Sequence, residues 1–124
     1  MTDRNLKMVA RYWAAINGKN ADGYLATFAK HAVAHDPVGS APLATTAERR
    51  TFITERLFDK FAQLRFTVDF VTAAGDCTAA KWSLAACTPE GTLVQMEGID
   101  AFRHAPDGLI ERLWAYPGTP VTTP

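Results

Sequence analysis

The chain has 124 residues, a length that suits a single domain over residues 1–124. Its 13 Lys and Arg residues balance 13 Asp and Glu residues, and 48% of its residues are apolar, as in a globular protein. This neutral composition gives no electrostatic reason to expect binding to nucleic acid or to an anionic membrane. No apolar run approaches the roughly 20 residues that span a bilayer, so membrane insertion is not expected. The first residues lack the apolar core of a signal peptide, which favours a cytoplasmic location.

The first half of the chain has the spacing of helices. From Asp3 to Asn17 the apolar residues recur at steps of three and four, which predicts one amphipathic helix. A short second helix is expected to begin at Asn20 or Asp22 and to run through Phe28.

An extended stretch and a loop are expected between the second helix and a third. Residues 32–35 are expected to be extended, and the loop 36–42 is rich in turn-forming residues. The third helix is expected to begin near Thr45 or Thr46. Thr45 and Glu48, three residues apart, fit a capping box.

The second half of the chain changes to the alternating pattern of β-strands. Strands are expected over residues 64–70, 77–87, 92–104 and 109–116, and the tail, residues 117–124, is expected to be loose. Helices followed by an antiparallel meander predict an α+β fold, in which three N-terminal helices pack on a curved, mainly antiparallel sheet. A curved sheet that closes over helices leaves a cavity between the layers, and such cavities hold small ligands.

The cysteines predict neither a disulfide nor a metal site. Cys77 and Cys87 are ten residues apart in one predicted strand. That length of strand separates them by roughly 33 Å, whereas a disulfide needs Cα atoms about 5.5 Å apart. The sequence has no CxxC pair and no Cys/His cluster with the spacing of a zinc site, so no metal is expected.

Asp100 is the most informative single residue. In the third predicted strand it lies between Gly98 and Phe102 on a face that is otherwise apolar. Its carboxyl group is therefore expected to point inward, where burial raises the pKa rather than leaving a buried charge. A carboxyl group that stays protonated donates a hydrogen bond to a ligand oxygen on which negative charge develops. The alternative is a structural role, in which Asp100 pairs with an arginine or caps a turn.

Two further residues stand at positions that suit a cavity. Tyr12 lies at the margin of the apolar stripe of the first helix, so its ring can pack in the core while its hydroxyl reaches a cavity. Asp36 ends a short predicted strand and precedes a proline-containing loop, a position that suits a cavity mouth. Taken alone, each has an ordinary alternative: core packing for Tyr12 and turn initiation for Asp36.

Three segments that contain these residues match one family in spacing and order. They are residues 11–17 (RYWAAIN), 36–42 (DPVGSAP) and 99–103 (IDAFR). With them the chain resembles bacterial Δ5-3-ketosteroid isomerase over nearly its whole length. The resemblance implies the cone-shaped α+β fold of the nuclear transport factor and SnoaL-like superfamily, and a homodimer.

The resemblance also implies a role for each of the three residues. Asp36 corresponds to the general base, and Tyr12 and Asp100 to an oxyanion hole in which a protonated aspartate is the known arrangement. The implied activity is that of a steroid delta-isomerase, which converts a 3-keto-Δ5 steroid to its Δ4 isomer through a dienolate. It needs no cofactor and no metal, and its partner is a small apolar, steroid-like substrate. The residues expected to form the wall around the substrate, with core packing as the alternative for each, are Phe28, Trp82, Met96, Phe102 and Trp114.

The chain departs from the family pattern at two positions. In some relatives a tyrosine on the third helix supports the oxyanion tyrosine, and here the nearest match is Ile53. Relatives tend to carry an aromatic residue just after the last strand, where Pro117 stands here. Both changes bear on turnover and steroid preference more than on the fold.

Two other functions share the predicted fold. One is a SnoaL-like polyketide cyclase or hydratase that uses the same cavity and an acid–base aspartate. The other is a non-catalytic dimer that binds a small apolar ligand. In either case the dimer surface is expected on the exposed face of the sheet, which would otherwise leave an apolar patch in water. The residues of that face are Leu93, Ile99, Leu109 and Leu113.

Overall fold

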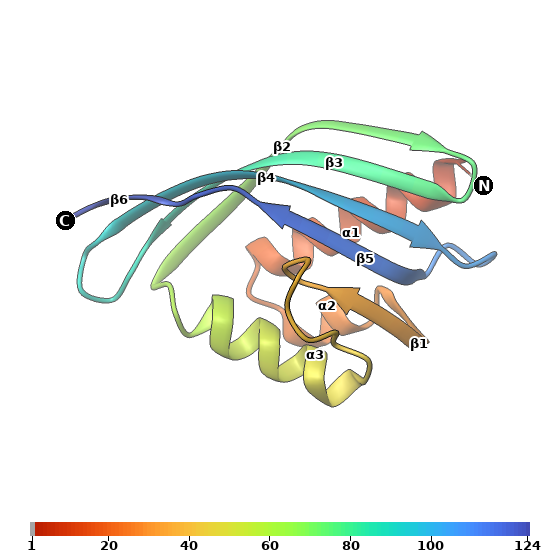
Figure 1. Ribbon diagram of the computed structural model, residues 1–124, viewed down its shortest axis with the longest axis horizontal. Coiled ribbons are helices and arrows are strands. Elements are labelled where there is room, and N and C mark those ends of the chain that lie inside the picture. The colour runs from red at the N-terminus through yellow and green to blue at the C-terminus, as the bar shows by residue number, and fades with distance from the viewer. Residues whose placement is uncertain (1) are drawn as a thin grey trace.

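The computed structural model describes residues 2–124, which form two layers (Figure 1). A curved sheet is one layer, and helices α1 (Thr2–Asn17), α2 (Ala21–Leu25) and α3 (Thr46–Ile53) lie on one side of it. This arrangement confirms the predicted α+β class, with N-terminal helices packed on a curved, mainly antiparallel sheet. None of the helices within residues 2–124 is long and apolar enough to cross a membrane.

The sheet has the strand order β1–β5–β4–β3–β2, and β6 pairs with part of β4. β1 runs parallel to β5, and all the other pairings are antiparallel. Because β1 and β5 run in the same direction, the loop that follows β1 starts beside the end of β5. The strands are β1 (Phe28–His35), β2 (Gln63–Ala74), β3 (Cys77–Cys87), β4 (Leu93–His104), β5 (Ile110–Pro117) and β6 (Val121–Thr123).

The second and third helices begin where the sequence predicts. The Asn20 side chain accepts a hydrogen bond from the backbone N–H of Gly23 and caps α2. Thr45 and Glu48 form the predicted capping box at the start of α3. These side chains satisfy backbone N–H groups that would otherwise lack a partner at a helix start.

The second helix is shorter than predicted. It ends at Leu25, and Phe28 is the first residue of β1 rather than the last of the helix. The Thr27 carbonyl accepts a hydrogen bond from the Ile110 N–H at 2.8 Å. The chain joins the sheet at this point, and tertiary pairing overrides the local helical pattern.

The third helix continues as a wider, π-helical turn, η1 (Thr54–Phe58). The Asp59 N–H donates to the Thr54 carbonyl, five residues earlier, at 2.8 Å. π-Helical turns are rare in proteins and occur often at functional sites. This turn leads from the last residues of α3 toward β2.

The prediction of a loose tail is wrong, because β6 pairs with residues 93–95 of β4. β5 covers only residues 98–104 along that edge of β4. The tail continues the pairing along the part of the edge that β5 leaves open. The Gly118 N–H, which donates to the Glu97 carbonyl at 2.7 Å, bridges the two paired stretches.

One residue of the predicted surface lies in the core. Leu113 is fully buried, whereas its spacing from Leu109 predicts exposure. A register shift leaves Glu111 without a partner on β4, and a bulge of this kind reverses the alternation of inward and outward side chains. Leu109 is itself half-buried against the core. Of the expected apolar face, Leu93 and Ile99 are exposed, at 53% and 48%.

The core between the two layers is rich in aromatic rings. α1 contributes Tyr12 and Trp13, and the sheet contributes Phe66, Trp82 and Phe102. Neighbouring rings in this group have centroids 5.0 to 6.3 Å apart. Dense packing restricts the rotamers of the rings, so the polar atoms that they carry are held in fixed directions.

Candidate functional site

A cavity of about 310 Å³ lies between α1, η1 and the sheet. This volume is at the lower end of the range, about 300–1,000 Å³, of small-molecule sites. Tyr12, Asp36 and Asp100 all line the cavity. They come from α1, from the loop after β1 and from β4, so the fold brings together three residues that are far apart in the sequence.

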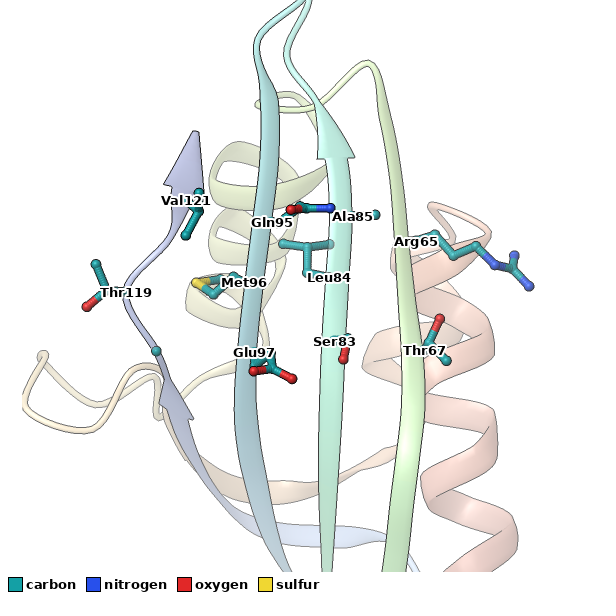
Figure 2. Close-up of a pocket in the computed structure, with 11 residues that line it drawn as sticks. Arg65, Thr67, Ser83, Leu84, Ala85, Gln95, Met96, Glu97, Thr119 and Val121 are labelled. Carbon is teal, nitrogen blue, oxygen red and sulfur yellow. The ribbon is translucent and has the colours of Figure 1, made fainter. Parts of the chain in front are cut away.

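A larger hollow of about 570 Å³ lies along strands β2, β3 and β4 and the tail that carries β6 (Figure 2). Exposed polar side chains from the outward face of the sheet form part of its wall, among them Arg65, Thr67 and Glu97. None of the three predicted polar residues lines this hollow. The smaller cavity is therefore the candidate functional site.

Asp100 has the inward orientation that the strand pattern predicts, and only 3% of the residue is exposed. Its neighbours on β3 and β5 are Ala80 and Ala115, and these small side chains leave room beside the carboxyl group. Asp100 Oδ1 accepts a hydrogen bond from Trp82 Nε1 at 3.0 Å, and Asp100 Oδ2 lies 3.4 Å from Tyr12 Oη. A tryptophan and a tyrosine thus hold the carboxyl group, rather than the arginine of the structural alternative.

Tyr12 brings its hydroxyl to the cavity from α1. The residue is 2% exposed, and its ring packs edge-to-face against Trp13 and Phe102, with centroids 5.0 and 5.1 Å away. Burial and the nearby charge of Asp100 raise the pKa of Tyr12 well above its ordinary value. The phenol therefore stays protonated at neutral pH and is a hydrogen-bond donor.

Asp36 reaches the cavity from the loop after β1. It is half-buried, and Pro37, joined to it by a cis peptide bond, also lines the cavity. The Val38 N–H donates to the Ala115 carbonyl at 2.9 Å and fixes the loop against β5. Because Ala115 is the β5 neighbour of Asp100, this bond holds the two carboxyl groups at the same cavity.

The pKa values of both carboxyl groups are raised. Desolvation, followed by the charge of Asp36, raises the pKa of Asp100 to about 8, against hydrogen bonds from Trp82 and Tyr12 that favour the carboxylate. Desolvation raises the pKa of Asp36 to about 7. Two carboxylates in one poorly solvated cavity repel each other, so the pair holds about one proton near neutral pH. Asp36 is the less buried of the two and ionises first, and Asp100 keeps the proton.

The hydrogen bond from Trp82 favours one oxygen of Asp100 as the site of that proton. An indole N–H only donates, so Asp100 Oδ1 acts as an acceptor, and this arrangement favours the proton on Oδ2. Oδ2 is the oxygen nearest to the Tyr12 hydroxyl. Two O–H groups therefore stand side by side at the cavity, where both can donate to a single ligand oxygen.

The structure brings two of the five expected wall residues to the cavity. Trp82 and Met96 line it. Phe28 and Phe102 do not, and they pack on the Tyr12 ring with centroids 6.2 and 5.1 Å from it. These two phenylalanines support the position of Tyr12 rather than facing the cavity.

Trp114 also lies away from the cavity. It alternates along β5 with Ala115, which does line the cavity, so its side chain is on the other side of the strand. Its ring stacks on His35, with centroids 6.3 Å apart. Pro117, at the end of β5, lines the cavity, whereas the buried Ile53 does not.

Several cavity residues were not identified from the sequence. Trp13 lines the cavity, and its buried indole N–H has no hydrogen-bond partner within residues 2–124. Arg56 and Lys60 add two cations to the same wall. The helical spacing of Trp13 indicated core packing, and nothing in the sequence marks the π-helical turn that carries Arg56. Across the part of the chain that the structure describes, no three His, Cys, Asp or Glu side chains gather as metal ligands.

Three solved structures share this fold over nearly the whole chain. A Δ5-3-ketosteroid isomerase from Mycobacterium sp. is 20% identical, with a TM-score of 0.85 over 99% of this chain and 100% of that one. SalBIII, an epoxide hydrolase/cyclase-like enzyme in pyran ring formation of the polyether salinomycin, is 20% identical, with a TM-score of 0.84 over 94% and 92%. A computationally designed 17-OHP binder is 17% identical, with a TM-score of 0.87 over 100% and 99%. At these identities the likeness shows the fold alone.

A protein-family model also matches this chain. The model of the SnoaL-like domain matches residues 9–113, which is most of the chain. The matched segment includes Tyr12, Asp36 and Asp100. The chain therefore belongs to the family of SnoaL-like domains.

Proposed function

We propose that the chain is an isomerase that converts a 3-keto-Δ5 steroid to the conjugated Δ4 isomer. The main support is the approach of Tyr12 Oη to Asp100 Oδ2, 3.4 Å, at a cavity that Asp36 also lines. Two donors and one base in a single cavity are the groups that a proton transfer through an enolate needs. The shared fold with a ketosteroid isomerase adds support for a ligand of that class.

In the proposed first step, the carbonyl oxygen of the substrate lies between the Tyr12 hydroxyl and the Asp100 carboxylic acid. Ionised Asp36 removes a proton from C4, and the electrons of that C–H bond move toward the carbonyl to form a dienolate. Negative charge grows on the oxygen, so both donors bind it more strongly than they bind the ketone. One donor of this kind contributes about 10²–10³-fold to kcat in other enzymes.

In the second step, Asp36 returns the same proton to C6. The C5–C6 double bond is consumed, the C4–C5 double bond forms, and Asp36 is again a carboxylate. A base that takes and returns a proton works best when its pKa is close to the working pH. The pKa of about 7 that burial gives Asp36 suits both halves of this cycle.

A cyclase or hydratase reaction is the second candidate. The raised pKa of Asp36 also suits a general acid that protonates a leaving oxygen of an epoxide or alcohol. SalBIII, which is epoxide hydrolase/cyclase-like, shares the fold at the same identity as the isomerase. Under this proposal Tyr12 and Asp100 bind a substrate oxygen without stabilising a dienolate.

Incubation with a Δ5-3-ketosteroid tests the first proposal, because the conjugated product has an ultraviolet band that the substrate lacks. We expect the band to grow faster than in buffer. Asp36→Asn is expected to lower kcat by about 10²–10⁴-fold, while the binding of a phenolic steroid is kept, since the donors remain. Asp59→Asn, which changes an exposed acid outside the cavity, is the matched control and should keep full activity.

The same assay separates the candidates. No rate above buffer, together with tight binding of the phenolic steroid, would indicate a non-catalytic binding protein. No rate and no phenol binding would remove the steroid proposal, and a panel of epoxide substrates would then test the cyclase proposal. Equal activity of the wild type and Asp36→Asn would show that Asp36 is not the base.

A further inference from the structure

Two cations line the candidate cavity on the side of η1. Arg56 lies within η1 and Lys60 follows it, and both belong to the wall that Asp36 and Asp100 also form. Both side chains are exposed, so the basic part of the wall faces solvent, whereas Asp100 is buried. The cavity therefore has an acidic floor and a basic rim.

The two rim cations have no acidic partner among residues 2–124. Neither Arg56 nor Lys60 takes part in an ion pair there, and Lys60 Nζ lies 5.5 Å from the ring centroid of Phe61. Glu55 and Asp59 are on the same segment but do not line the cavity. The rim therefore presents two positive charges that no ion pair neutralises within residues 2–124.

Helical spacing along α3 and η1 brings these side chains to one wall. Phe52, Arg56 and Lys60 are four residues apart and all line the cavity. The hydrogen bond from the Asp59 N–H to the Thr54 carbonyl spans five residues and widens the turn between them. Side chains four residues apart lie on the same face of an ordinary α-helix, and these three line the same wall across the wider turn as well. The unusual backbone and the unpaired cations thus occur together at the cavity.

We propose that the substrate is amphipathic, with a carbonyl at one end and an anionic oxygen group at the other, which pairs with Arg56 and Lys60. The inference rests on the proposed function for the carbonyl end and adds the chemistry of the remote end. A guanidinium and an ammonium bind carboxylate, sulfate and phosphate oxygens. The ionised Asp36 repels an anion, so the same charges also fix the orientation in which such a substrate enters.

Binding of three matched phenolic steroids tests this inference without turnover. They carry a carboxylate, its methyl ester or a sulfate at the end remote from the phenol, and quenching of Trp13 and Trp82 fluorescence reports their binding at the cavity. We expect the carboxylate and the sulfate to bind about tenfold more tightly than the ester at low ionic strength. Added salt should reduce this preference, because the rim is exposed to screening. The ratio of carboxylate to sulfate affinity identifies the anion that the rim prefers.

Reversing the charges of Arg56 and Lys60 tests whether these two residues cause the preference for anionic ligands. The double variant Arg56→Glu/Lys60→Glu is expected to lose the preference for the anionic ligands and to bind the ester as before. Lys7→Glu/Lys30→Glu changes two exposed lysines outside the cavity wall and should keep the preference. If the reversal variant unfolds, Arg56→Gln/Lys60→Gln removes the two positive charges without adding negative ones. This second variant should also lose the preference for the anionic ligands.

Equal affinity for ester and anions in the wild type, or a preference that survives charge reversal, would overturn the inference. The outcome is distinguishable from failure of the proposed reaction. Anion preference without isomerisation of a Δ5-3-ketosteroid keeps the rim site and removes the isomerase. Isomerisation with no anion preference keeps the isomerase and removes the rim site.

Discussion

Asp100 and His104 lie four residues apart on the inward face of β4, and each is 3% exposed. The two buried side chains differ in how completely they are hydrogen-bonded. Both ring nitrogens of His104 have close partners: Nδ1 lies 2.8 Å from the Gly108 carbonyl, and Nε2 lies 2.8 Å from Thr78 Oγ1. A carbonyl only accepts, so Nδ1 carries the proton and Nε2 accepts from the Thr78 hydroxyl. Desolvation lowers the pKa of His104, which keeps the ring neutral.

Asp100 is also neutral near pH 7, but its hydrogen bonding is incomplete. Oδ1 has a close partner in Trp82, whereas Oδ2 is 3.4 Å from Tyr12 Oη, well beyond the usual O–H···O distance of about 2.7–2.8 Å. Oδ2 is also the oxygen beside the cavity. Burial and a shifted pKa are thus common to a structural and a candidate functional residue, and unfinished hydrogen bonding next to a cavity distinguishes them.

The largest expected effect that separates the two residues is on turnover. Asp100→Ala removes one donor to the dienolate and is expected to lower kcat/KM by about 10²–10³-fold on a Δ5-3-ketosteroid. Asp100→Asn should lose less, since an amide still donates. The unfolding temperature of Asp100→Asn should be at least that of the wild type, because the amide keeps an acceptor for the Trp82 N–H and removes a buried ionisable group. A large loss of stability would place Asp100 with His104 as a structural residue.

His104→Ala is expected to show the reverse pattern. It leaves the Thr78 hydroxyl and the Gly108 carbonyl without their buried partner, and should lower the free energy of unfolding by about 2–3 kcal/mol. Urea denaturation measures this loss. Activity per folded molecule should stay near the wild-type value, since His104 does not line the candidate cavity. A loss of activity without a loss of stability would contradict the comparison.

The two residues should also give opposite pH dependences of stability. The pKa of Asp100 is raised from 3.8 to about 8, so the folded state holds the extra proton in that range and stability falls as pH rises through it. The pKa of His104 is lowered from 6.5, so stability falls as pH drops below 6.5. Each slope is at most about 1.4 kcal/mol per pH unit. In urea titrations, Asp100→Asn should reduce the first slope, and Asp36, whose pKa is also raised, should supply what remains of it. His104→Asn should flatten the second slope, and an Asp100→Asn slope equal to wild type would refute the assignment.

The smallest effect is expected at the residue that positions Asp100. Trp82→Phe keeps the ring but removes the N–H that favours the carboxylate, so the pKa of Asp100 should rise further. Loss of one such bond corresponds to about 1 kcal/mol, or roughly fivefold in kcat/KM. The pH profile of kcat/KM is the decisive measurement, because a purely structural role of Trp82 would lower the rate without moving the profile.

Local rules account for much of this fold. The alternation along β4 predicted the inward carboxyl group of Asp100, and the spacing of Thr45 and Glu48 predicted the start of α3. Both signals depend on residues within a few positions of one another. Non-local pairing explains the main errors: the bulge that turns Leu113 inward and the contact with β5 that draws Phe28 into β1.

The candidate site was predictable only in part for the same reason. The inward side chain of Asp100 follows from one strand, but its bond to Trp82 depends on the register between β3 and β4. Gly98, which lies opposite Trp82 in that register, leaves the space for the indole, and a Cβ at this position would overlap the ring. The sequence placed Gly98 on the inward face without indicating that it makes room for Trp82.

Asp36 and Asp100 together hold about one proton near neutral pH. Binding of a charged ligand at the cavity is therefore coupled to the uptake or release of protons. An anionic oxygen that binds beside Asp100 favours its protonated form, so the complex takes up protons from solution between the pKa values of about 7 and 8. For a phenol acidic enough to be ionised before it binds, calorimetric heats of binding are then expected to change with the ionisation enthalpy of the buffer. The long hydrogen bond at Oδ2 of Asp100 would thus be visible as a buffer-dependent heat, even in a protein whose backbone does not move on binding.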